Sequence, residues 1–189
     1  METKPQLKDF NLTKVKLVDG GLVANYQLTE VIGGEPSVND YQVSADRCIH
    51  PDLQSLFKDL RSVVGRVFGL TSFLTITDGK ELGLSEAKKE VARAYANGIL
   101  DKIDVRGLSW SGSDESIGIV ITSVYETPNG LKTCINTPRI KVAQISFGFE
   151  EEIEQIADAI KNEVYEYLFN GKQQQLSLFG ETPNEPDKD

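Results

Sequence analysis

The feature that most constrains the fold is an order that occurs twice along the chain: three strand-like segments, then one long amphipathic helix. The first group of segments lies within residues 12–45 and is divided at Asp19-Gly20-Gly21 and Gly33-Gly34. Between Leu53 and Phe68 apolar residues recur every three or four positions, which predicts a helix with one buried stripe. Pro51 and Asp52 are typical of the first turn of such a helix.

The second group repeats this order in the other half of the chain. Strands are predicted over 103–110, 117–125 and 131–136, and the turn sequence Thr127-Pro128-Asn129-Gly130 joins the last two. A second helical stripe follows over 149–168, with three glutamates at its start. Between the two groups, residues 71–77 favour a short strand, and a weaker helix begins near Ser85.

These patterns predict an α+β fold in which antiparallel meanders are covered by long amphipathic helices. We expect a single domain over 1–171, with halves 12–69 and 101–171, a helical insert over 70–100, and a tail over 172–189. A sheet with a covering helix is the common way to bury two apolar faces, and the halves share no residue identity that indicates duplication.

Charge and composition predict a soluble protein of the bacterial cytoplasm, in a normal or a phage-infected cell. No run approaches the roughly 18 apolar residues of a membrane span, and the first ten residues lack the apolar core of a secretory signal. The net charge is −9, of which residues 150–189 carry −8. A neutral body with an acidic end gives no indication of nucleic-acid binding from net charge alone.

Catalytic and metal-binding patterns are weak, so we expect a protein without enzymatic activity or cofactor. Cys48, His50 and the distant Cys134 cannot supply a structural zinc site, and two cysteines exclude a disulfide framework. Cys48 and His50 have no third group that orients them, so a half-buried thiol beside a helix-capping histidine is the simpler interpretation. The segment from Gly107 to Gly112 does not fit G-x-S-x-G, and phosphate-binding glycine loops are missing.

One surface is a candidate for nucleic acid. The second meander places cations and aromatic residues in one sheet region, as single-strand-binding proteins do. The candidates are Arg106, Trp110, Tyr125, Lys132, Arg139 and Lys141. Whether Trp110 and Tyr125 face solvent or the core depends on the strand register, which the sequence leaves open.

The acidic tail contains an unexpected apolar cluster. After Gly171 the helical period ends, and the last residues have the composition of a disordered, flexible segment. Within it, Leu176, Leu178 and Phe179 have no neighbouring stripe to join, so they need a surface that buries them.

The segment Gln175-Leu176-Ser177-Leu178-Phe179 resembles the Gln-Leu-x-Leu-Phe pentapeptide with which bacterial replication and repair proteins bind the sliding clamp. The resemblance implies that Gln175 hydrogen-bonds in a polar subsite and that Leu176 bridges to an apolar pocket filled by Leu178 and Phe179. The body is similar to small accessory proteins that phages and prophages encode near replication or recombination genes. A replication or repair accessory protein tethered to the clamp is therefore the predicted function.

Three other interpretations stay open. The motif segment packs on an exposed edge of its own domain; or the chain is a single-stranded DNA-binding or recombination accessory protein of phage origin; or it is an enzyme whose site the sequence does not reveal.

Overall fold

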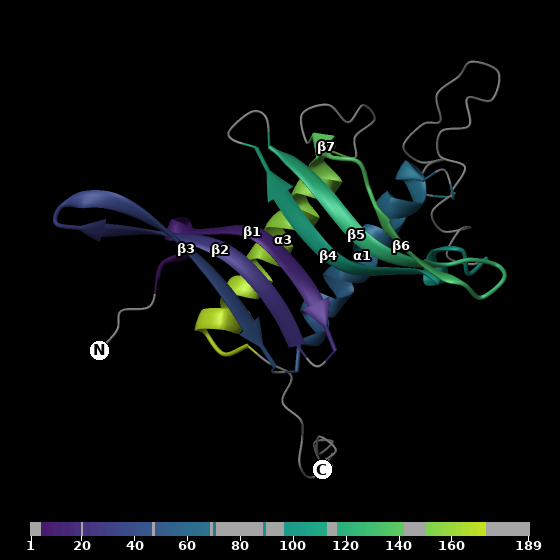
Figure 1. Cartoon of the computed structure of the whole chain (residues 1–189), viewed down its shortest axis with the longest axis horizontal. Coiled ribbons are helices and arrows are strands. Elements are labelled where there is room, and N and C mark those ends of the chain that lie inside the picture. Colours follow the sequence, from purple (N-terminus) through teal and green to yellow (C-terminus); the bar gives the residue numbers. More distant parts are fainter. Residues whose placement is uncertain are drawn as a thin grey trace, which may run out of the picture.

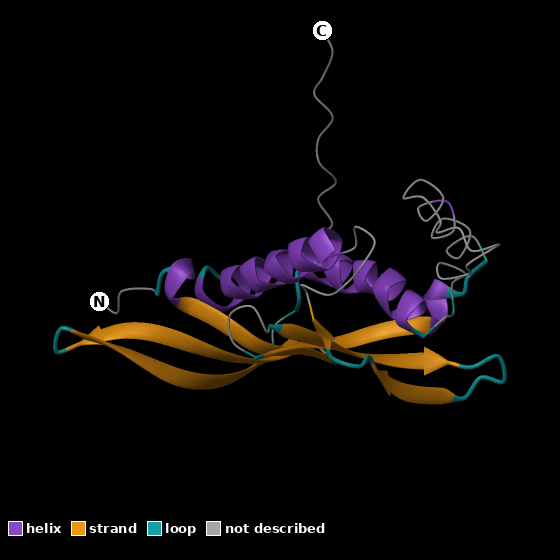
Figure 2. Cartoon of the chain, turned by 90° about the horizontal axis from the view of Figure 1, so that it is seen from above, coloured by secondary structure: helices purple, strands orange, loops and turns teal. Residues whose placement is uncertain are grey.

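In the computed structural model, two long helices lie on one face of an antiparallel sheet (Figures 1 and 2). The structure describes residues 5–19, 21–46, 48–68, 70, 89, 97–112, 117–141 and 150–172. The predicted α+β class is confirmed. Apart from Lys89, which is helical, the strand and helix expected within 71–96 lie outside the described residues, as does the tail beyond Lys172.

The elements follow the predicted order closely. The strands are β1 (Phe10–Val18), β2 (Gly21–Ile32), β3 (Glu35–Ala45), β4 (Ile103–Ser111), β5 (Gly118–Glu126), β6 (Lys132–Asn136) and β7 (Ile140–Lys141), and the helices are α1 (Pro51–Val67) and α3 (Glu150–Phe169). Short 3-10 helices, Leu7–Asp9 and Leu100–Lys102, precede β1 and β4. β3 begins at Glu35, because the Gly33-Gly34 turn (φ +66° and +92°) pairs Ile32 directly with Glu35.

The two meanders form one continuous sheet, which the sequence did not predict. The strand order is β3-β2-β1-β4-β5-β6, and β7 pairs with β5 beside β6. β1 pairs antiparallel with both β2 and β4, so the first strands of the two halves meet in the middle. Because this contact joins residues about 90 positions apart, no local signal in the chain specifies it.

The two halves match in structure although their residues differ. The 3-10 helix Leu100–Lys102 lies 93 positions after Leu7–Asp9, and the β-bulge between Val105 and Gly107 lies 93 positions after that between Leu12 and Lys14. Val15 lies opposite Leu108, its own counterpart by that offset. A pseudo-twofold axis therefore passes between β1 and β4 and relates the halves.

The buried faces of the two helices also correspond to each other, with an offset of 100 residues. Four buried positions of α1 correspond to four buried positions of α3 that lie 100 residues later. The pairs are Leu53 and Ile153, Phe57 and Ala157, Leu60 and Ile160, and Val64 and Val164. α1 contacts both α3 and β4, so the helix of the first half also covers the second half.

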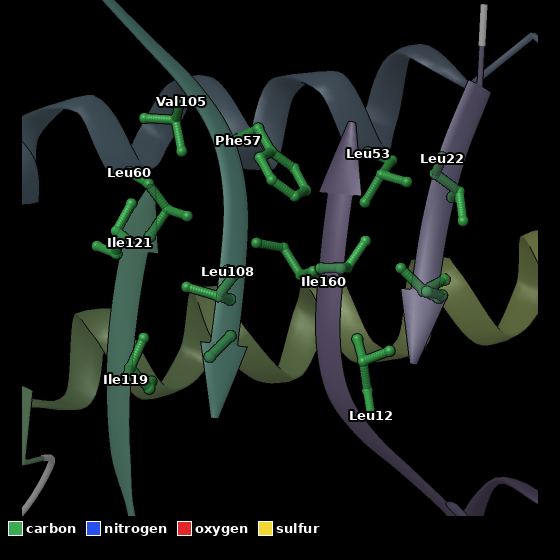
Figure 3. Packing of buried hydrophobic residues seen from close by; sticks show 14 of the residues in the cluster. Leu12, Leu22, Leu53, Phe57, Leu60, Val105, Leu108, Ile119, Ile121 and Ile160 are labelled. Carbon is green, nitrogen blue, oxygen red and sulfur yellow. The ribbon is translucent and has the colours of Figure 1, made fainter. Parts of the chain in front are cut away.

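The core lies between the helix layer and one face of the sheet. Figure 3 shows Leu53, Phe57 and Leu60 of α1 directed at the strands, with Ile160 of α3 beside them. Leu22, Leu60 and Ile121 are all 0% exposed. Alternate strand residues point away from the helices and form the open face of the sheet, where Lys14 and Lys16 of β1 are exposed.

Candidate partner-binding and nucleic-acid sites

Lys172, the first residue of the tail, forms ion pairs with both helices. Lys172 Nζ lies 2.8 Å from Asp52 Oδ2, in the first turn of α1, and within 2.9 Å of both carboxylate oxygens of Glu163 on α3. Asp52 reaches this position because His50 caps α1: its Nδ1 accepts a hydrogen bond from the Asp52 backbone N–H at 3.3 Å. The motif Gln175–Phe179 lies outside the described residues and begins three positions after Lys172.

This ion pair shifts the protonation of its members. The hydrogen bond from Lys172 lowers the pKa of the Asp52 carboxyl. Hydrogen bonds to Asp52 and then to Glu163 raise the pKa of Lys172. Both shifts favour the charged forms of the pair.

We expect Lys172→Met to raise the pKa of Asp52 toward its ordinary value, because the largest cause of the lowering is removed. A lowered folded-state pKa stabilises the fold above the ordinary carboxyl pKa of about 3.9, and this contribution is lost as the pH falls through the lower value. Carboxyl NMR titration of Asp52 checks the shift, with Lys132→Met on β6 as control. An Asp52 titration that stays unchanged in Lys172→Met would contradict the assignment.

The same cluster has the ligand types of a cation site. Ligand atoms of His50, Asp52 and Glu163 lie within 4.8 Å of one another. The Lys172 ammonium already lies between the two carboxylates at hydrogen-bonding distance. The arrangement thus has the geometry of an internal ion pair that joins the end of α3 to the start of α1. Sequence reasoning missed it, because 120 positions separate Lys172 from Asp52.

The nucleic-acid candidates do not gather on one face. Trp110 lies opposite Ile119, and Tyr125 lies opposite Ile103. Both isoleucines are buried under the helices, and directly opposite residues share a face of the sheet. Trp110 and Tyr125 are accordingly half-buried against the core. The register that the sequence left open thus places both aromatic residues on the helix-covered face.

The cationic candidates have different surroundings. Arg106 forms ion pairs with Asp104, through Nε, and with Asp19, whose carboxylate oxygen lies 3.6 Å from Nη1. Arg139 donates from Nη2 to the Ser111 carbonyl oxygen at 2.8 Å and lies over Gly118. Lys132 is exposed and lies opposite Glu126, on the face opposite to Tyr125. Lys141 lies on β7 opposite Gly118.

Two cations that sequence reasoning did not nominate lie at the centre of the open face. Lys14 is flanked by Asn25 on β2 and Ser109 on β4, and Lys16 by Val23 and Gly107. The alternation of the two lysines with the buried Val15 and the half-buried Leu17 was visible in the sequence. Only the pairing of β1 with β4 shows that this strand is central rather than at an edge.

A pocket of about 360 Å³ lies beside α1, at the end of the sheet where β1 turns into β2. Cys48, Lys58, Arg61 and Asp104 line it together with apolar residues such as Phe57. His50, which the sequence places near Cys48, is not among the lining residues and instead caps α1. The half-buried thiol and the capping histidine of the simpler interpretation are both found.

Within the part of the chain that the structure describes, no helix has the length and apolar character needed to cross a membrane. No protein-family model, no curated protein and no solved structure matches this chain.

Proposed function

We propose that this chain is a non-enzymatic accessory protein of DNA replication or repair that binds a bacterial sliding clamp through Gln175–Phe179. The observation that carries the proposal is the sequence Gln175-Leu176-Ser177-Leu178-Phe179. Its apolar residues supply anchors for a pocket, and the glutamine amide both donates and accepts, which fixes the register of a bound peptide.

The ion pairs of Lys172 support a short tether between the body and the motif. Seven residues, 173–179, separate the anchored lysine from the end of the motif, and they span at most about 25 Å when fully extended. A clamp bound at Phe179 would thus lie close to the end of the body where α1 begins and α3 ends. A ring with several identical pockets raises the effective concentration of such a peptide, so modest affinity per site suffices.

The test is a titration of the purified full-length chain against a bacterial sliding clamp, by calorimetry or fluorescence anisotropy. We expect saturable binding that Leu178→Ala weakens by about ten- to a hundredfold, because a leucine that fills a pocket contributes roughly 1.5–3 kcal/mol. Ser177→Ala is the matched control, since this position is variable in the pattern and should leave the affinity unchanged. Equal binding of wild type and Leu178→Ala, or binding of neither, would overturn the proposal.

Single-stranded DNA binding is a second candidate, favoured by the exposed Lys14 and Lys16 on the open face. Uncharged polar residues, including Asn25 and Ser109, lie directly beside Lys14. Binding of labelled single-stranded DNA that weakens steeply with salt, and that persists in Leu178→Ala, would favour this candidate over the first.

A further inference from the structure

β3 is an edge strand with a regular pattern of outward backbone groups. It is the last strand on its side of the sheet among the described residues. The two-glycine turn makes Ile32 and Glu35 a hydrogen-bonded pair, and bonded and non-bonded pairs then alternate along β2 and β3. The residues that direct both N–H and C=O away from β2 are therefore Val38, Asp40, Gln42 and Ser44.

We propose that two copies of this chain dimerise through β3, paired antiparallel about a twofold axis at Tyr41. In this register Asp40 faces Gln42 of the second copy, and Val38 faces Ser44, so no like charges are opposed. An axis at Asp40 would instead oppose two carboxylates, and an axis at Gln42 would place Val38 opposite Asp46. Charge and polarity therefore select the register centred on Tyr41.

Tyr41 supplies the apolar anchor of the interface. Its ring stacks on that of Tyr26 with centroids 5.4 Å apart and planes at 14°, yet Tyr41 remains 36% exposed at the edge of the sheet. In the dimer the two Tyr41 side chains meet in a non-hydrogen-bonded pair, where side chains approach most closely. The stacked tyrosines of each copy then form one row, and tyrosine is enriched in protein interfaces.

This row continues into the core of each copy. Tyr26 is 6% exposed and lies 5.1 Å from Phe10 and 5.8 Å from Phe169, between ring centroids. An interface at Tyr41 would therefore extend an existing aromatic cluster rather than create an isolated contact.

The other residues of β3 limit the pairing to Val38–Ser44. Pro36 cannot donate a hydrogen bond, and Glu35 adds a charge beside the turn, both of which are devices that prevent edge pairing. Among the described residues, the opposite edge carries the five-residue β6 and the two-residue β7. Val38–Ser44 thus lies within the longest proline-free edge segment among the described strands, Ser37–Ala45, and Asp40 is the one charged residue of that segment.

Light scattering after gel filtration tests the proposal, and it requires no clamp or DNA. We expect a particle of twice the 20.9 kDa chain mass at about 100 µM. Gln42→Pro removes an N–H that points away from β2, so it should leave the monomer folded by circular dichroism but weaken the dimer about tenfold or more. Gln42→Ala keeps this N–H and is the matched control.

Disulfide trapping tests the register independently. In a Cys48→Ser/Cys134→Ser background, Tyr41→Cys should cross-link to its counterpart on mild oxidation. Directly opposite residues lie within disulfide reach, and the covalent bond traps even a dimer that the loss of the ring weakens. Asn39→Cys should not, because four residues along an antiparallel pair separate it from its counterpart by about 13 Å. A single-chain mass throughout, or equal cross-linking of both variants, would overturn the proposal. So would a dimer that appears only after removal of residues 173–189, which would show that the tail covers this edge.

Discussion

Leu60→Ala is expected to lower the free energy of unfolding by about 3 kcal/mol, one of the two largest effects that the structure predicts. Leu60 is 0% exposed and lies on the face of α1 that is directed at the strands (Figure 3). Its removal creates a cavity between helix and sheet. The backbone hydrogen bonds between β4 and β5 hold the neighbouring residues in place, so these residues fill the cavity only partly. Chemical denaturation followed by circular dichroism measures the change.

Leu131→Ala provides the matched control for this substitution. Leu131 is 67% exposed in the turn between β5 and β6, so the same chemical change should alter stability by less than about 0.5 kcal/mol. A Leu60→Ala effect as small as that of the control would show that α1 does not pack on the sheet as described.

Gly21→Ala is expected to destabilise the fold by about 2–3 kcal/mol through steric overlap rather than through a cavity. A Cβ at Gly21 would lie 1.9 Å from the carbonyl oxygen of Ala45, and this atom belongs to the backbone of β3. The strand ends must therefore separate to accept one methyl group. Thermal unfolding of the variant measures the loss.

The turn between β2 and β3 supplies the control for Gly21. Gly33 has a φ of +66° with no atom within 4 Å of an added Cβ, and asparagine tolerates this left-handed conformation. Gly33→Asn should change stability by less than about 1 kcal/mol. A loss in Gly21→Ala no larger than that in Gly33→Asn would contradict the steric overlap with Ala45.

Local periodicity predicted the elements well because burial on one face leaves a regular trace in the residue order. The stripe from Leu53 to Val64, and the alternation of Val15 and Leu17 with Lys14 and Lys16, each follow the geometry of their element. The cap of α1 was also predictable, since His50, Pro51 and Asp52 act within a single turn.

Candidate sites were harder to predict than elements. Trp110 and Tyr125 have the right composition for a stacking surface, but a shift of strand register by one residue reverses which face a side chain occupies. The observed register directs both toward the helices. Lys14 and Lys16 became candidates only once β4 was seen to pair with β1.

The α+β class, the positions of the helices and strands and the apolar motif in an acidic tail could all be read from the sequence, because each depends on residues within a few positions of one another. Three features emerged from the three-dimensional structure: the two meanders share one sheet, a pseudo-twofold axis relates them, and Lys172 at the start of the tail forms ion pairs with Asp52 and Glu163. These features depend on contacts between distant parts of the chain, whose partners are chosen by the packing of the whole core and not by any local pattern.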